Sequence, residues 1–373
     1  MKFFYTAVMT ILISAGQTNA GVADWTPYPG LLGIRLPDGF GIEIYAEGVE
    51  GARSLCLGKA GTVFAGSRDA GSVYAIVDRD GEPGADRVLV LADGLDTPNG
   101  VAFLNGDLYV AEIDRILRFD NIENRLEDPP APEVVRDDLP HYQLHGWRYI
   151  SFGPDGKLYI PLGAPCNVCE PDDSLLATIT RMNPDGSEFQ VYASGIRNTV
   201  GFDWNPETGV LWFTENGRDG MGDNEPPDEL NSAPVAGLHF GFPYVHGMDI
   251  LDPSHGAEHS PENYRSPEIE LGPHVAALGM RFYHGNMFPE SYNGRILIAE
   301  HGSWDRDEPI GYRITMVDVS DGFAEDYRVF AEGWLSGDDA FGRPVDVLVM
   351  PDGALLVSDD RADMIYRIFY GQR

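Results

Sequence analysis

One pattern of hydrophobic and polar positions recurs six times along the chain: an apolar run, a turn that contains glycine, a second apolar run, and then polar residues. The copies span 54–69, 100–112, 149–163, 200–216, 291–301 and 345–360, with turn glycines at Gly61, Gly106, Gly156, Gly209, Gly294 and Gly353. Short apolar runs paired across such turns are typical of antiparallel β-hairpins. Repeats of about 40–50 residues that each hold several short strands are typical of propeller blades. The pattern therefore predicts an all-β, six-bladed β-propeller; a β-sandwich of unrelated hairpins is the alternative.

A second, shorter repeat lies upstream of four of these copies. It reads YAEG at 45–48, LADG at 91–94, YASG at 192–195 and FAEG at 330–333. Each copy ends a β-rich run, and we interpret it as the outer strand of one blade leading into the next blade. Because the first copy precedes blade one, residues 39–48 are expected to form the outer strand of blade six. Ring closure by this N-terminal strand would leave no open sheet edge.

Composition and charge narrow the class of protein. Residues 1–20 combine Lys2, an apolar stretch and the small-residue site TNA at 18–20, which is the pattern of a secretory signal peptide. We therefore expect a periplasmic or secreted protein with one propeller domain over residues 21–373. No later run is apolar and long enough to predict a membrane span. The formal net charge of −33 disfavours nucleic acid and anionic lipid as partners.

The chain has three cysteines. In an oxidising compartment, Cys166 and Cys169 are expected to form a local disulfide. Attachment of a c-type haem is excluded because Glu170, and not histidine, follows the second cysteine. Cys56 lies in an apolar run and is expected to be a small core residue.

Blade geometry predicts where polar chemistry gathers. Residues just before the first run and just after the second run of each copy should meet around one mouth of the central channel. This rule places there Arg53, Arg68, Asp69, Asn99, Glu112, His145, Arg148, Ala164, Arg197, Asn198, 215–219, Met280, His301, Arg343, Asp346, Asp359 and Asp360. Several arginines at one mouth of an acidic protein favour a bound anion, because the guanidinium fork matches a carboxylate. Structural pairing, such as Arg343 with Asp346, is the alternative.

Two further features at this mouth suggest chemistry. The loop at 215–231 alternates oxygen-bearing side chains with glycine, which suits a hard cation such as Ca²⁺, although its spacing is not that of an EF-hand. A solvated acidic loop is the alternative. His145 is suited to act as a general base, because the ordinary pKa of histidine lies near neutrality. Its spacing is equally compatible with a hydrogen-bonded structural histidine, as is that of His274 and His301.

Over essentially all of residues 21–373 the sequence resembles the soluble glucose/sorbosone dehydrogenase family that depends on pyrroloquinoline quinone (PQQ). The details are closer to the sorbosone-type branch. The matching segments are HGWR at 145–148, FGPDG at 152–156, GIRN at 195–198, TENGRD at 214–219, DELN at 228–231, HGSW at 301–304 and GRPVD at 342–346.

The resemblance implies PQQ over the channel mouth and oxidation of a sugar or sugar aldehyde by hydride transfer to the quinone. It implies that His145 is the catalytic base and that Arg197 and Asn198 contact the quinone oxygens. Arg343 matches a clamp on a cofactor carboxylate. An external electron acceptor must reoxidise the cofactor, and the sequence does not identify it.

Calcium is the second implied cofactor. The main-chain carbonyls of Gly217 and Arg218 match ligands of the Ca²⁺ that also binds PQQ. Glu229 falls where the family binds a second, structural Ca²⁺. His301 and Arg148 are further polar groups expected near the cofactor.

Two departures from the family pattern put its glucose-type activity in doubt. Ala164 stands where glucose-oxidising members carry an aspartate that orients the histidine, and Val345 replaces a second cofactor-clamping arginine. Two other functions stay open on the residues alone: a Ca²⁺-dependent lactonase on a similar propeller, and a non-catalytic propeller that binds protein or sugar.

Overall fold

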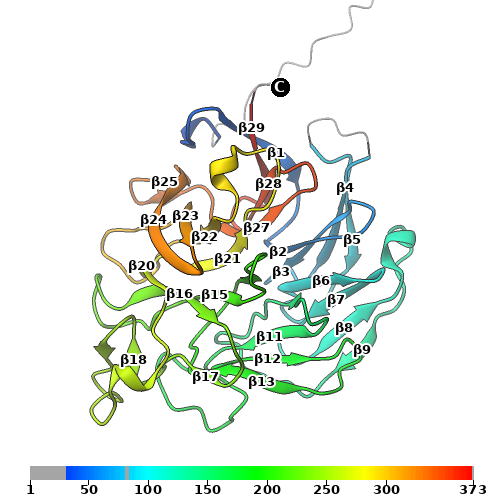
Figure 1. The fold of residues 1–373 in the computed structure, drawn as a ribbon. Helices are drawn as coiled ribbons and strands as arrows, with labels where there is room; N and C mark the ends of the chain where they lie inside the picture. The colour runs from blue at the N-terminus through cyan, green and yellow to red at the C-terminus, as the bar shows by residue number, and fades with distance from the viewer. Residues whose placement is uncertain (1–30, 80–83, 372–373) are drawn as a thin grey trace, which may run out of the picture.

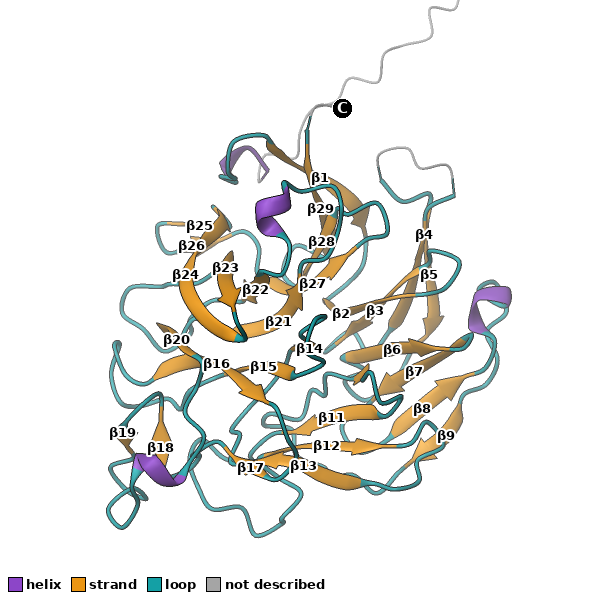
Figure 2. Cartoon of the chain, viewed as in Figure 1, coloured by secondary structure: helices purple, strands orange, loops and turns teal. Residues whose placement is uncertain are grey.

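Six antiparallel sheets form a ring around a central axis in the computed structural model, which describes residues 31–79 and 84–371 (Figure 1). The all-β, six-bladed propeller predicted from the repeats is thereby confirmed. Strands and loops account for nearly all of the described chain (Figure 2). No helix in those residues is long and apolar enough to cross a membrane. The predicted signal peptide at 1–20 lies outside the described residues.

Each blade has four strands, which follow one another from the channel outward. They are β2 (Ala52–Leu57), β3 (Val63–Ser67), β4 (Val73–Val77) and β5 (Arg87–Ala92) in blade one; β6 (Gly100–Leu104), β7 (Asp107–Ala111), β8 (Ile116–Phe119) and β9 (Glu133–Arg136) in blade two; β10 (Ser151–Phe152), β11 (Leu158–Leu162), β12 (Thr178–Met182) and β13 (Gln190–Ser194) in blade three; β14 (Phe202–Trp204), β15 (Leu211–Glu215), β16 (Pro227–Ala233) and β20 (Ile269–Pro273) in blade four; β21 (Ala277–Phe282), β22 (Ile296–Glu300), β23 (Arg313–Ser320) and β24 (Phe323–Glu332) in blade five; and β27 (Pro344–Val349), β28 (Leu355–Asp359), β29 (Met364–Tyr370) and β1 (Phe40–Glu47) in blade six.

The short elements lie in the connections. They are the 3₁₀ helices η1 (Leu31–Gly33), η2 (Ile122–Asn124), η3 (Pro261–Asn263) and η4 (Glu290–Tyr292), and the strands β17 (Leu238–His239), β18 (Val245–His246), β19 (Ile250–Leu251), β25 (Leu335–Ser336) and β26 (Asp339–Ala340).

The N-terminal strand closes the ring as the second repeat predicted. Strand β1 pairs antiparallel with β29, from Phe40 opposite Tyr370 to Glu47 opposite Met364. The first and last described strands therefore share one blade, and unfolding of either end would open the ring.

The turn glycines explain why the repeat is visible in the sequence. All six have a positive φ, between 69° and 105°. Residues with a Cβ rarely adopt this conformation, so the hairpin between the first two strands of every blade calls for glycine.

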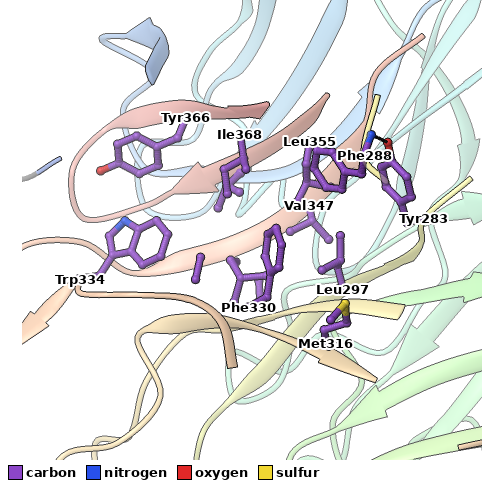
Figure 3. Close-up of a cluster of buried hydrophobic side chains, with 14 of the residues drawn as sticks. Tyr283, Phe288, Leu297, Met316, Phe330, Trp334, Val347, Leu355, Tyr366 and Ile368 are labelled. Atoms are coloured by element: carbon purple, nitrogen blue, oxygen red, sulfur yellow. Dashed lines mark hydrogen bonds between the residues drawn. The ribbon is translucent and has the colours of Figure 1, made fainter. Parts of the chain in front are cut away.

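Apolar side chains of adjacent blades fill the space between them. One such cluster, between blades five and six, is drawn in Figure 3 and includes Tyr283, Phe288, Leu297, Met316, Phe330, Trp334, Val347, Leu355, Tyr366 and Ile368. Phe40 of the closing strand packs edge-on against Phe288 and Phe330, with ring centroids 4.7 and 5.2 Å apart. Full burial of a phenylalanine ring contributes about 1.5–3 kcal/mol. Phe40 is partly buried and gains a share of this, so packing as well as main-chain hydrogen bonds holds the closing strand.

An insertion between β16 and β20 accounts for the longest gap between repeats. Its strand β17 pairs in parallel with β13 of blade three, so a segment of blade four reaches back over its neighbour. The insertion is tied to the site loop through the buried Asp252, whose Oδ2 lies 2.6 Å from Nη1 of Arg218. Nε2 of His246 lies 3.1 Å from the same oxygen.

Candidate active site

A cavity of about 390 Å³ opens at one end of the channel. It is lined by Arg53, Arg68, Leu144, His145, Trp147, Arg197, Asn198, Asn216, Gly217, Asp219, Asp228, His274, Ala276, Leu278, His301, Gly302, Ser303, Trp304, Tyr312 and Arg343. The structure thus brings together ten of the residues that blade geometry assigned to the mouth. Four of the lining side chains are arginines and two are carboxylates, so the wall of the cavity is cationic although the whole chain is strongly acidic.

His145 is fixed in one tautomer by the main chain. Its Nδ1 lies 2.8 Å from the carbonyl oxygen of Ala164, which can only accept a hydrogen bond. Nδ1 therefore carries the proton and Nε2 carries the lone pair. Gly163 makes this approach possible, because a Cβ at that position would lie 2.5 Å from the Cβ of His145.

The environment of His145 keeps the imidazole neutral. Burial and the positive charges of Arg197 and Arg148 lower the pKa of His145 to about 3, although the bond to Ala164 opposes the shift. The residue is 6% exposed. At neutral pH it is therefore a proton acceptor with a directed lone pair.

Arg197 follows shortly after strand β13, and its guanidinium is held against the cavity wall. Its Nε donates to the carbonyl oxygen of Asn167 at 2.8 Å, and its Nη1 donates to the carbonyl oxygen of Asn216 at 3.1 Å. Its Nη2 bonds to Oδ1 of Asn167 at 3.0 Å and to Oδ2 of Asp219 at 3.1 Å. Asn198, the next residue, donates from Nδ2 to Oδ1 of Asn216 at 3.3 Å.

Three cationic or ionisable side chains converge on Asp360. Nε2 of His301 lies 2.9 Å from Oδ1, and Nη1 of Arg53 lies 2.9 Å from Oδ2. Nε of Arg343 is within 3.2 Å of Oδ1, an ion-pair distance, but it is not aligned for a hydrogen bond. Although burial raises the pKa of Asp360, His301 and the two arginines hold it well below its usual value.

The Asp360 cluster corrects the alternative pairing of Arg343 with Asp346. Asp346 is buried behind the wall, where its Oδ2 accepts from the amide of Leu55 at 2.8 Å and lies 3.3 Å from Nη2 of Arg281. Arg343 is left as a cation with an incompletely satisfied guanidinium at the cavity.

Arg148 does not line the cavity. It is 1% exposed and donates to three main-chain carbonyl oxygens, those of Ile113, Pro140 and His145, at 3.1, 2.8 and 3.3 Å. The structure therefore gives Arg148 the geometry of a support beneath the His145 segment and not that of a ligand for an anion in the cavity.

The loop that contains Gly217 and Arg218 is anchored by the buried Asp228. Its Oδ1 accepts from the amide of Gly217 at 2.8 Å, and its Oδ2 accepts from the amide of Ala277 at 3.1 Å. Among the described residues, none donates a hydrogen bond to the carbonyl oxygens of Gly217 or Arg218. These two oxygens are therefore available as ligands.

Behind this loop lies a buried pair of carboxylates on adjacent strands. Glu215 on β15 stands opposite Glu229 on β16. Oε2 of Glu215 and Oδ1 of Asn231 are buried without a hydrogen-bond donor in the described part of the chain. Burial, and then the charge of Glu229, raise the pKa of Glu215 well above its usual value, and burial raises the pKa of Glu229 to about 7. Both shifts mean that burial disfavours the charged form of these carboxyl groups.

The two departures from the family pattern have local explanations. Ala164 is fully buried against Ala177 and Phe242, so its side chain packs while its carbonyl orients His145. Val345 packs with Val200 and Leu278 in a small apolar cluster near Trp147. Both side chains thus lie in apolar surroundings, which suit the residues that this chain carries.

Sequence reasoning missed Asn167 and gave Asp360 no role. Asn167 lies between the two cysteines, which the structure joins in a disulfide with Cα atoms 6.2 Å apart, while Cys56 is a free thiol. The sequence signal for Asn167 was its enclosure between two cysteines three residues apart. Asp360 was assigned to the mouth, but nothing in the spacing identified it as the shared partner of a histidine and two arginines.

Comparison with known proteins assigns the chain to a family. The model of the glucose/sorbosone dehydrogenase family matches residues 123–367. A protein of Borreliella burgdorferi, described as uncharacterized, is 34% identical over 354 residues, which cover 90% of this chain and 91% of that protein.

Solved structures share the fold at low sequence identity. A calcium structure of a Trichoderma reesei member of carbohydrate-active enzyme family AA12 superposes with a TM-score of 0.80 at 18% identity, over 91% of this chain and 97% of that one. The holo form of the PQQ domain of pyranose dehydrogenase from Coprinopsis cinerea gives a TM-score of 0.76 at 18% identity, over 90% and 97% of the two chains.

Proposed function

The chain belongs to the glucose/sorbosone dehydrogenase family, and we propose that it is a PQQ- and Ca²⁺-dependent dehydrogenase that oxidises a sugar or sugar aldehyde. The observation that carries the proposal is the pairing of a neutral, oriented base, His145, with an arginine-lined cavity. A base and an anion site are the two parts that hydride transfer to an anionic quinone requires from the protein.

The cavity suits an anionic cofactor. Arg53, Arg68, Arg197 and Arg343 face it, and the guanidinium of Arg343 has a nitrogen without an aligned acceptor. PQQ carries three carboxylates on a planar ring system, which matches the arginine fork in charge and shape. When bound, PQQ supplies the redox chemistry by accepting a hydride equivalent, and the protein supplies placement and field.

The residues of the chain then divide the remaining work. His145 accepts a proton at Nε2 from the hydroxyl group on the substrate carbon, because its Nδ1 already donates a hydrogen bond to Ala164. Arg197 would hold a buried positive charge at the cavity that stabilises negative charge on a bound acceptor, and this charge is fixed before the reaction begins. Asn198 lines the same wall beside it.

The oxygen donors fit a hard cation such as Ca²⁺. No three His, Cys, Asp or Glu side chains in the described ranges converge into a preformed metal site. The fit therefore rests on the free carbonyl oxygens of Gly217, which lines the cavity, and of Arg218 next to it. Glu229 and the unpartnered oxygens of Glu215 and Asn231 lie behind them. Carbonyl and carboxylate oxygens in mixed sets are typical calcium ligands.

The substrate follows from the chemistry of the base. An aldose at its anomeric carbon and an aldehyde as its hydrate both present a hydroxyl-bearing carbon to His145. Trp304, which is 78% exposed at the cavity, offers an apolar ring face to a sugar. A periplasmic or secreted location and an external electron acceptor complete the proposal.

The test is reconstitution of the purified protein. Dye reduction should require PQQ and Ca²⁺ together on at least one member of a panel of aldoses and sorbosone-type aldehydes, and EDTA should abolish it. His145→Ala should lower turnover by about two to four orders of magnitude at saturating PQQ. Hydrolysis of lactones without PQQ would instead support the lactonase alternative, and binding of PQQ with normal turnover in His145→Ala would exclude the assigned base.

A further inference from the structure

The geometry points to a positioning element in the short loop between the two bonded cysteines. We propose that Asn167, held in the disulfide-closed segment 166–169, is a positioning residue that fixes the guanidinium of Arg197 at the cavity. The inference rests on the proposed function, because it assigns Arg197 its orientation toward a bound anion.

Asn167 contacts Arg197 with both its main chain and its side chain. Its carbonyl oxygen accepts from Nε at 2.8 Å, and its Oδ1 accepts from Nη2 at 3.0 Å. The same side chain clamps the adjacent loop, since Oδ1 accepts from the amide of Asp219 at 2.9 Å and Nδ2 donates to the carbonyl of Asp219 at 2.9 Å. One asparagine thus bridges the arginine and the loop that carries its counter-ion.

These contacts determine which way the arginine can donate. A guanidinium has five N–H groups. Bonds to Asn167, Asn216 and Asp219 use one on Nε, one on Nη1 and both on Nη2. One N–H on Nη1 is left for a ligand, so Asn167 converts a flexible cation into a donor with a fixed direction.

The same connection, between β11 and β12, also orients the side chain of His145. The amide of Ala164 donates to the carbonyl oxygen of Arg197 at 2.8 Å, and the carbonyl of Ala164 accepts from Nδ1 of His145 at 2.8 Å. His145 and Arg197, the two residues proposed to act in the reaction, are therefore both hydrogen-bonded to the connection between β11 and β12. That connection has no strand or helix of its own, so the Cys166–Cys169 bond limits its conformations in place of a backbone ladder.

The principal test replaces Asn167 by alanine. Asn167→Ala keeps the carbonyl that receives Nε but removes Oδ1 and Nδ2. Binding of PQQ to the cofactor-free protein, followed by quenching of the cavity tryptophans, should weaken about ten- to hundredfold, the usual effect of losing one hydrogen bond to a charged group. At saturating PQQ, kcat should also fall by about tenfold or more while KM for the sugar changes less.

The matched control is Asn183→Ala. Asn183 lies in the same blade, and its side chain bonds to Lys157 and Ser187 at the β12–β13 turn, away from the cavity. It should leave PQQ affinity and kcat unchanged. A loss of thermal stability in Asn167→Ala with wild-type affinity and kcat would make Asn167 a merely structural residue and overturn the proposal.

A signal from Arg197 itself separates this inference from the proposed function. In the cofactor-free protein labelled with ¹⁵N-arginine, the Nη2–H signals of Arg197, assigned with Arg197→Lys, should exchange slowly with solvent and should exchange faster in Asn167→Ala, which removes their Oδ1 acceptor. If the wild type fails to bind PQQ or to oxidise any sugar, the proposed function falls, while this exchange rate still decides the positioning role. An unchanged rate overturns it.

Removal of the disulfide provides an independent test. The Cys166→Ser/Cys169→Ser double variant should reproduce the weakened PQQ binding and lowered kcat of Asn167→Ala. Cys56→Ser, which removes the remaining thiol at a site in blade one, is its control. Wild-type kcat and PQQ affinity in the double variant would overturn the part of the proposal that assigns the closed loop a role in placing Asn167.

Discussion

Replacement of His145 by alanine should remove a measurable contribution to the pH dependence of stability in the cofactor-free protein. His145 has a pKa of about 3 in the folded state, against about 6.5 for an unperturbed histidine. Between these values the unfolded chain binds a proton that the folded protein does not. Stability contributed at this site is therefore complete above pH 6.5 and is lost as the pH falls toward 3.

The size of the effect follows from the two pKa values. Relative to pH 8, protonation of the unfolded state costs the wild type about 2 kcal/mol at pH 5 and about 3 kcal/mol at pH 4. The charged groups that act on the ring are Arg197 and Arg148, both positive, and no carboxylate is among the principal influences on its pKa. His145→Ala lacks the linkage at this site, while all other titrating groups are common to both proteins.

The assay is urea unfolding followed by tryptophan fluorescence at pH 8, 6, 5 and 4, without PQQ. The difference in unfolding free energy between wild type and His145→Ala should shrink by about 2 kcal/mol from pH 8 to pH 5. His141→Ala, which removes an exposed imidazole from the same segment, is the matched control. A difference that stays constant with pH would refute the buried, neutral state of His145.

Three further outcomes are expected. Arg343→Ala should lose PQQ affinity first and recover activity when PQQ is in excess, because it removes a clamp and leaves the base intact; activity lost at every PQQ concentration would contradict this role. Thiol titration of the denatured protein should find one reactive group, from Cys56, because Cys166 and Cys169 are bonded to each other; three groups would mean that the bond is absent in solution. Glu215→Gln, which keeps an oxygen for the Arg197 amide but cannot ionise when a cation binds, should shrink the rise in melting temperature that Ca²⁺ produces, and an unchanged rise would place the cation elsewhere.

The fold was predictable because its information is local and repeated. Every blade needs a positive-φ glycine in its first hairpin, so Gly61, Gly106 and their counterparts mark the period directly. Ring closure followed from the surplus strand before blade one. The insertion between β16 and β20 left no such mark, because its role is set by contacts between distant segments, such as Asp252 with Arg218.

The sequence predicted which residues lie at the mouth of the channel, because their position relative to the strand ends determines this. It did not predict contacts made by the main chain. Placement of residues at the mouth succeeded for His145, Arg197 and Arg343, since each lies shortly before the first strand of a blade. The rule did not predict that Arg148 points away from the cavity. Its partners are main-chain carbonyl groups, which the residue types in the sequence do not reveal. The contact of Asn167 with Arg197 was missed for the same reason, because one of its two hydrogen bonds is made by the main-chain carbonyl of Asn167.

With Ala164 in place of an aspartate, the ring of His145 is still oriented by a hydrogen bond to Nδ1. The acceptor of that bond is a neutral carbonyl and not a charged carboxylate. A carboxylate would fix the same tautomer but would also raise the pKa of His145 by favouring the imidazolium. The neutral carbonyl fixes Nδ1–H and leaves burial and Arg197 to keep the ring uncharged. Under the proposed mechanism, a less basic imidazole provides less driving force for proton abstraction, so more of the stabilisation must come from the positive charge of the arginines. The precision with which Asn167 and Asp219 hold Arg197 is consistent with that division of work.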